Sequence, residues 1–198
     1  MNLNKALSFL AYGFLLILIN INITVGEMTV NLTPSFVGWF LMFLAYEPLG
    51  NYTRGNTLLK WVPLALAVIG AVMTVLTFFA RQLTIDAPAL PAVISGLCSL
   101  ASVVYMYLLF GTLEDVASDC HPALFGRIRI LKYLTIALEL AGLAATLYVY
   151  YMGASLPVTS YAMVAGVLGL VMLAVAVVTA VTLFQLRKKA MSASFQKW

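Results

Sequence analysis

The chain has 198 residues, of which 63% are hydrophobic and only 9% are charged. Its mean hydropathy is +1.02, whereas a soluble domain carries about 25% charged residues and about 45–50% apolar ones. A soluble fold of this size is therefore excluded, and the solvent of the folded chain is lipid. The net charge of +4 is small, and the basic residues lie at the ends of apolar segments. That placement is typical of membrane orientation and argues against nucleic acid as a partner.

Six apolar segments follow one another along the chain, and the connections between them are too short for a separate domain. We therefore predict an all-α fold, a single polytopic bundle of six transmembrane helices over residues 1–198. The predicted helices cover about residues 6–24, 30–46, 59–80, 89–112, 130–151 and 158–186. No small-residue cleavage site follows the first segment, so we expect it to be a retained helix and not a signal peptide.

The second segment is the weakest of the six. Its clearly helical part runs from Pro34 to Tyr46, which is about 20 Å of helix against a hydrocarbon core about 30 Å thick. It spans only if residues 30–33 join it. Otherwise the segment is re-entrant or interfacial, and the chain has five spans.

The distribution of basic residues predicts the orientation. With six spans and the N-terminus inside, Arg81 is the only one of the 11 lysines and arginines on the outer side. In the five-span alternative only Lys5 changes sides. The positive-inside rule therefore places the C-terminus in the cytoplasm in both arrangements, and it favours both ends inside.

Glu139 is the one acid that falls clearly inside a predicted span. An acid at that depth costs about 2.5–3.5 kcal/mol on insertion scales, so it should face protein or a wet cavity. Polar and small residues continue its helix face at a spacing of three or four: Lys132, Thr135, Gly142, Thr146 and Tyr150. The preceding predicted helix carries Ser99 and Ser102 at a matching depth, and we expect one of them to hydrogen-bond Glu139.

These polar residues support two readings. The functional one is a solute or proton site that comprises Glu139, Ser99, Ser102, Thr135 and Asn20. The alternative is structural, because small and hydroxyl residues drive helix packing in membranes without any ligand. Asn20, together with Asn22 and Asn31, either lines an outward-facing polar pocket or caps the helix ends.

Three further patterns are read as structural. The last segment carries small residues at four-residue spacing, which predicts a packing face: Ala162, Ala165, Gly166 and Gly169. Acids and bases between the fourth and fifth segments are expected to balance one another as solvated loop charge: Glu114, Asp115, Asp119, Arg127, Arg129 and Lys132. Asp119, Cys120 and His121 are consecutive, and consecutive residues rarely converge on one ion. We expect no metal, no cofactor and no catalytic site.

The first 50 residues also carry a recognisable combination of motifs. Its parts are Tyr12-Gly13-Phe14, an apolar run that ends in Asn20 and Asn22, and a Pro-x-Phe-x-Gly element at Pro34, Phe36 and Gly38. This N-terminal hairpin resembles that of a loose group of small membrane proteins from Gram-positive, clostridia-like bacteria. The group is uncharacterised, so the resemblance implies a bacterial cytoplasmic membrane but no activity and no site residues.

Three classes of function remain open. The composition favours a non-catalytic accessory or assembly subunit that binds other membrane proteins. The second class is a small-solute transporter, or the substrate-binding subunit of one, that uses the polar interior around Glu139. The third is an intramembrane enzyme, which we do not expect because no second carboxylate lies at the depth of Glu139.

Overall fold

The computed structural model describes residues 3–18, 22–25, 28–31, 35–53, 55–79, 89–152 and 158–195, with the strands described by their backbone alone. Six main helices confirm the predicted helix count. They are α1 (Leu3–Leu18), α2 (Ser35–Leu44), α4 (Leu58–Phe79), α5 (Ala89–Cys120), α6 (Phe125–Met152) and α7 (Val158–Phe195). Short turns complete the order: α3 (Tyr46–Leu49) and the 3-10 turns η1 (Gly50–Tyr52) and η3 (Pro122–Leu124).

The first two predicted helices need correction, because a β-hairpin replaces parts of both. Strand β1 (Asn22–Val25) pairs antiparallel with β2 (Met28–Asn31), and Asn22 lies opposite Asn31. The segment alternates polar and β-branched residues, and that period of two favours a strand over a helix. The register places the asparagines and threonines of both strands on one face and the aliphatic residues and Met28 on the other. Asn22 and Asn31 are therefore cross-strand partners, and their predicted capping or pocket-lining roles fall on side chains outside the description.

Helix lengths distinguish the first helix pair from the rest. Helix α1 has 16 residues and α2 has 10, or about 24 Å and 15 Å of helix. In the part of the chain that the structure describes, three helices are long and apolar enough to cross a membrane, within Leu58–Val75, Gly96–Cys120 and Gly166–Ala190. Helices α5, α6 and α7 also continue past the predicted bounds 89–112, 130–151 and 158–186, because a helix does not have to end where its apolar stretch ends.

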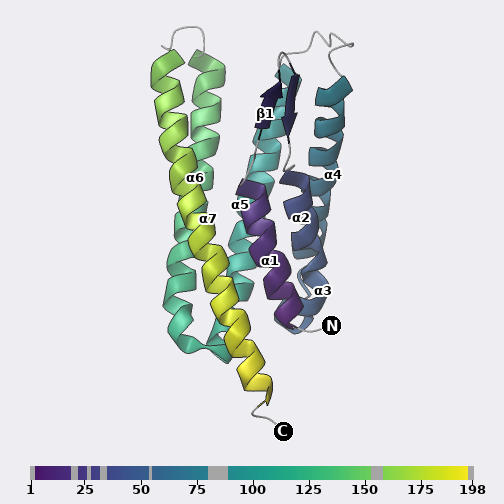
Figure 1. The fold of residues 1–198 in the computed structure, drawn as a ribbon, viewed down its shortest axis with the longest axis vertical. Coiled ribbons are helices and arrows are strands. Elements are labelled where there is room, and N and C mark those ends of the chain that lie inside the picture. Colours follow the sequence, from purple (N-terminus) through teal and green to yellow (C-terminus); the bar gives the residue numbers. More distant parts are fainter. Residues whose placement is uncertain are drawn as a thin grey trace.

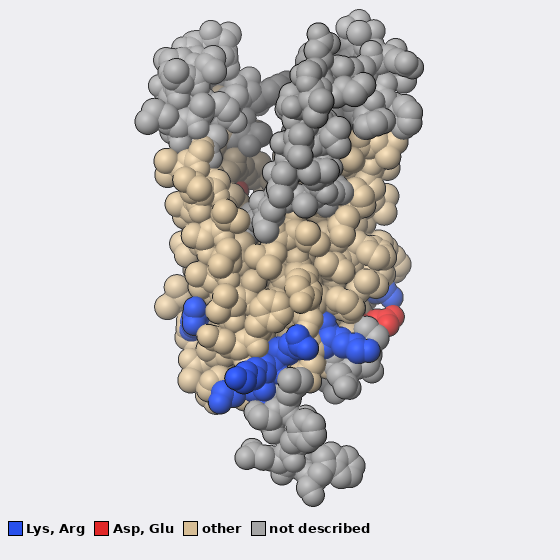
Figure 2. All heavy atoms as spheres, viewed as in Figure 1, with Lys and Arg blue, Asp and Glu red and all other residues tan. Residues whose placement is uncertain are grey.

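The helices run alternately up and down, so that α1 begins and α7 ends at the same end of the molecule (Figure 1). Helix α1 packs between α7 and α2, α2 packs on α4, and α5 packs on α6. On the face drawn in Figure 2, lysine and arginine side chains form a belt around the end where the termini lie. Arg54, Arg81 and Lys197 lie outside the described residues.

The core lies in the half of the bundle nearest to the termini, and α5 is its central helix. Fully buried side chains of α5, such as Tyr105 and Phe110, meet α1 and α2 through ring contacts. The Phe14 and Phe110 centroids are 5.7 Å apart, and the Trp39 and Tyr105 centroids are 5.6 Å apart in an edge-to-face arrangement. Aromatic pairs of this geometry add to the packing energy of the buried surface.

Two glycines set the spacing of α1 and α2. A Cβ atom on Gly38 would lie 2.6 Å from Ile17 Cγ1 and 2.7 Å from the Gly13 carbonyl oxygen. A Cβ on Gly13 would lie 3.0 Å from the Gly38 carbonyl oxygen. The two backbones therefore approach as closely as small residues allow in membrane helix pairs. This contact gives the glycine of the Pro-x-Phe-x-Gly element a structural role.

Two of the four small residues that were predicted to form a packing face on α7, Gly166 and Gly169, do not contact a neighbouring helix among the described residues. A Cβ on Gly166 or on Gly169 would meet no described atom within 4 Å, and both glycines are exposed. The predicted packing face is therefore open at these two positions among the described residues. The side chains of Ala162 and Ala165 lie outside the description.

Candidate functional site

The structure brings two of the predicted site residues into direct contact. Glu139 lies on α6 and Ser102 lies on α5, and the Ser102 hydroxyl makes a side-chain hydrogen bond to the Glu139 carboxyl group. Ser102 is buried, whereas Ser99 is half-buried one turn away. The expected bond from α5 to Glu139 therefore comes from Ser102. Asn20 lies outside the described residues.

Glu139 and Thr135 share a cavity between four helices. Its other walls come from α1, α5 and α7: Phe14, Ile17, Met106, Met172, Val175, Ala176 and Thr179, with Leu138 of α6. The volume of about 20 Å³ is close to the minimum that one water molecule needs. A metabolite does not fit this cavity in the conformation described.

One polar atom at this cavity is unsatisfied. The Thr135 hydroxyl oxygen is buried and has no hydrogen-bond partner among the described residues. Thr179, on the opposite wall, donates to the Val175 carbonyl oxygen at 2.8 Å within its own helix. A carboxyl group and an unpaired hydroxyl on one helix face suit a single water, a proton or a small cation.

A second and much larger pocket lies at the basic end of the bundle, between η1, α5 and α6. Its volume is about 330 Å³, which falls in the size range of small-molecule sites. Its lining combines charged, aromatic and amide side chains: Tyr52, Thr53, Asn56, Leu59, Tyr107, Leu108, Gly111, Thr112, Glu114, Asp115 and Lys132. The sequence analysis did not single out this pocket.

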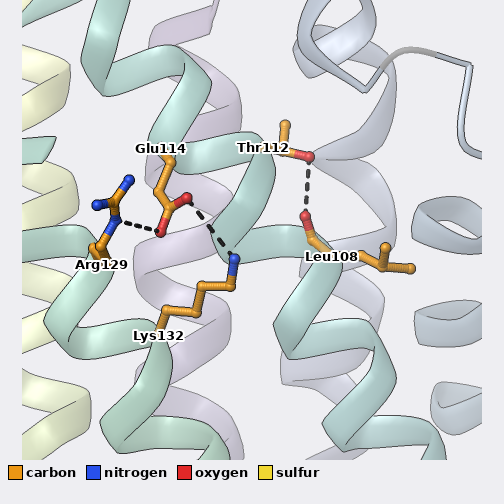
Figure 3. A network of polar contacts seen from close by, with 5 residues as sticks. All are labelled: Leu108, Thr112, Glu114, Arg129 and Lys132. Carbon is orange, nitrogen blue, oxygen red and sulfur yellow. Dashed lines mark hydrogen bonds and ion pairs between the residues drawn. The ribbon is translucent and has the colours of Figure 1, made fainter.

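Glu114 of α5 forms the centre of an ion-pair network on the wall of this pocket (Figure 3). Its Oε2 atom lies 3.8 Å from Lys132 Nζ, and its Oε1 atom lies 3.9 Å from Arg129 Nε. These distances are at the long end of the ion-pair range. The Glu114 Oε1 atom is buried and accepts no hydrogen bond among the described residues, so the carboxylate keeps unused acceptor capacity.

Lys132 is held in place by several neighbouring groups and not by the Glu114 carboxylate alone. Its side chain is only 9% exposed. The ammonium group lies 4.3 Å from the centre of the Tyr107 ring, a cation–π contact. It also lies over Gly111, where an added Cβ would be 3.9 Å from Lys132 Nζ. The position of a buried cation is therefore fixed by an acid, an aromatic ring and a glycine on the neighbouring helix.

This network corrects the expectation of solvated loop charge. Helix α5 continues to Cys120 and α6 begins at Phe125, so Glu114 and Lys132 face each other within a helix pair. The helical spacing of residues on α5 and α6 could have predicted that Glu114 and Lys132 face each other. Tyr107, Gly111 and Glu114 follow one another at intervals of four and three, and Lys132 belongs to the stripe that continues to Glu139.

The rim of the pocket carries a phenol and an amide. Burial, followed by the electrostatic effect of Cys120 and Asp119, raises the pKa of the Tyr52 phenol above its ordinary value. Tyr52 is therefore a neutral hydrogen-bonding group at physiological pH. The Asn56 side-chain oxygen accepts the Leu58 backbone N–H at 3.1 Å at the start of α4, which fixes the orientation of that side chain.

No family model, no curated protein and no solved structure matches the chain.

Proposed function

We propose that this chain is a multi-pass protein of a bacterial cytoplasmic membrane that binds a small polar solute, as a carrier or as the substrate-binding subunit of a transporter. The observation that supports the proposal is the inner face of α6. Lys132, Thr135 and Glu139 follow one another on it at helical spacing, Lys132 lines the large polar pocket, and the other two line the small cavity. One helix thus connects a solute-sized site with an acid at mid-depth.

The arrangement of the ends supports an orientation with both termini in the cytoplasm. Helix α1 begins and α7 ends at the end that carries the basic belt (Figure 2), and basic residues favour the cytoplasmic side. Six crossings follow if α1 and α2 cross as helix plus strand. Four extended residues add about 13 Å to each. The result is about 37 Å for α1 with β1 and about 28 Å for α2 with β2, against about 30 Å for the hydrocarbon core.

The chemistry of the large pocket indicates the kind of solute. Glu114 Oε1 needs a hydrogen-bond donor, and Asp115 adds a second carboxylate to the lining. Lys132 supplies a cation for an acceptor, and Tyr52 and Tyr107 supply aromatic surface. A small molecule with both a donor or positive group and an acceptor or negative group matches this lining. Glu139 is about 10 Å further along α6, and we assign it a proton or a single ion and not the solute itself.

The proposal is tested by the thermal unfolding of the purified protein in detergent with panels of amino acids, amines, small carboxylates and nucleosides. The key variant, Glu114→Gln with Lys132→Met, removes both charges of the pair so that neither is left buried alone. Glu47→Gln with Lys60→Met is the matched control outside the pocket. At least one solute class should raise the melting temperature of the wild type and the control but not of the key variant. The proposal is wrong if no class does so, or if the key variant responds equally.

A non-catalytic accessory or assembly subunit is the second candidate. Two observations favour it: a Cβ added at Gly166 or Gly169 of α7 would meet no described atom within 4 Å, and the sheet has only two strands among the described residues. Each strand then has an edge to be covered, because unpaired sheet edges do not face lipid. A second membrane protein that co-purifies with the wild type and is lost with Gly166→Leu and Gly169→Leu would support this candidate over the first.

A further inference from the structure

A third pocket lies between the first turns of α1 and the last turns of α7, at the basic end of the bundle. Its volume is about 320 Å³, and it is lined by Asn4, Lys5, Ser8, Phe9 and Arg187. It shares no lining residue with the pocket around Lys132. An inference drawn from it therefore does not depend on the proposed solute site.

Within the described part of the chain, the lining of this pocket is positively charged. Lys5 and Arg187 are its two charged residues there, and none of the described lining residues is a carboxylate. Among the described residues neither cation has an ion-pair partner. Two neighbouring cations without a counter-charge repel each other, and a bound anion removes that repulsion.

One hydrogen-bond donor and one acceptor of the residues that line the pocket have no partner among the described residues. Arg187 Nε is a buried donor without a partner, and Asn4 Oδ1 is a buried acceptor without one, among the described residues. A buried donor or acceptor without a partner destabilises the fold, because it has lost its hydrogen bonds to water. The Ser8 hydroxyl donates to the Asn4 carbonyl oxygen at 2.9 Å, so it can only accept from a ligand. A ligand that complements this pocket therefore carries both an anionic hydrogen-bond acceptor and hydroxyl donors.

The surroundings add an apolar side. Phe9 lines the pocket, and one turn further along α1 the rings of Tyr12 and Phe184 meet at 5.6 Å. Apolar surface therefore continues from the basic end along the α1–α7 seam. A ligand with a charged head and hydrocarbon chains can place its head at Lys5 and its chains along this seam.

We propose that this pocket binds the headgroup of an anionic glycerophospholipid that carries free hydroxyls, the chemistry of phosphatidylglycerol. The phosphate oxygens accept from Lys5 and from the guanidinium of Arg187. The headgroup hydroxyls donate to Asn4 and Ser8. Basic pockets between helices at the membrane surface are the usual places for such recognition. The headgroup would also join the start of α1 to the end of α7.

The test is lipid binding to the full-length purified protein, measured by native mass spectrometry with graded additions of single lipids. Phosphatidylglycerol should bind more tightly than phosphatidic acid, which lacks the headgroup hydroxyls, and both more tightly than phosphatidylcholine. Lys5→Gln with Arg187→Gln should weaken phosphatidylglycerol binding about thirty-fold, the effect of two surface cations on an anionic lipid. Lys60→Gln with Lys188→Gln is the control for loss of charge in general.

Two further arms make the result decisive. Asn4→Leu, which keeps both charges, should remove most of the preference for phosphatidylglycerol over phosphatidic acid. Inorganic phosphate and glycerol phosphate should fail to displace the lipid at millimolar concentration. Three results would overturn the proposal. They are phosphatidylcholine binding as tight as that of phosphatidylglycerol, unchanged phosphatidylglycerol affinity in the Lys5→Gln, Arg187→Gln variant, and full displacement of the lipid by inorganic phosphate. Lys5 is exposed, so Lys5→Gln alone tests it if the Arg187 variant does not fold.

Discussion

Lys132 Nζ on α6 lies 3.8 Å from Glu114 Oε2 on α5, and the Lys132 side chain is only 9% exposed. This pair joins two helices and at the same time forms part of the wall of a polar pocket of about 330 Å³. A buried ion pair is weak evidence for stability, because the desolvation of both charges offsets their attraction. Its position on a pocket wall, with an unsatisfied carboxylate oxygen, points instead to binding.

The first prediction concerns this pair. Glu114→Gln leaves the Lys132 ammonium buried without its carboxylate, and it should lower the free energy of unfolding by about 3 kcal/mol. Adding Lys132→Met should restore most of that loss, because no uncompensated charge then remains. Reversible unfolding in mixed micelles measures both values. Glu47→Gln, at an exposed acid, serves as the control, and a single Glu114 variant as stable as the wild type would rule out the pairing.

Glu139 provides the second prediction. Glu139→Gln keeps a hydrogen bond with Ser102 and should be tolerated. Glu139→Leu leaves the Ser102 hydroxyl without its partner and should lower the free energy of unfolding by about 1–3 kcal/mol. A double-mutant cycle with Ser102→Ala should give a coupling energy of about 1 kcal/mol. Ser99→Ala should show almost no coupling. If the Leu variant unfolds at the same temperature as the wild type in detergent, the contact does not contribute to stability.

The third prediction concerns the crossing of α1 and α2. Gly38→Ala would place Cβ 2.7 Å from the Gly13 carbonyl oxygen and 2.9 Å from the Ile17 backbone nitrogen. Backbone atoms cannot move aside cheaply, so the variant should lose about 2–3 kcal/mol of stability. Gly126→Ala is the control, since a Cβ there meets nothing within 4 Å. Equal thermal stability of the two variants would mean that α1 and α2 do not approach this closely.

Orientation gives the fourth prediction. A fluorescent protein that folds only in the cytoplasm should be bright when it is fused to either end of the chain, because both ends are proposed to lie inside. A reporter that is active only outside should be silent at both. Brightness at the C-terminus alone would support the five-span arrangement, in which the first helix enters from the opposite side.

Hydropathy was sufficient for the long helices and misleading for their ends. The predicted segment 59–80 nearly coincides with α4, Leu58–Phe79. The predicted boundary at 112 places Glu114 outside its helix, because hydropathy ends a segment where charged residues begin. Helices α5 and α6 in fact continue through these charged turns, and pairing across the two helices makes the charges compatible with burial.

The β-hairpin was predictable in principle. Between Asn20 and Thr33 polar residues alternate with aliphatic ones, and Gly26 stands at the two-residue connection that hairpins favour. The expectation that apolar segments of a membrane protein are helical outweighed this period of two. Matching depth predicted a contact of Glu139 with Ser99 or Ser102 but could not distinguish between the two serines. The size of the cavity beside Glu139 could not be predicted, because it depends on how side chains from four helices pack.

The most direct test of the proposed function is gentle purification of the wild type, the control variant Glu47→Gln with Lys60→Met, and the paired variant Glu114→Gln with Lys132→Met from native membranes. Mass spectrometry then identifies everything that each protein retains. The wild type and the control should retain the same small polar molecule at a stoichiometric level, and the paired variant should lose it. Retention of the same molecules by all three proteins, or of a second protein and no small molecule by the wild type, would contradict a solute site at Lys132.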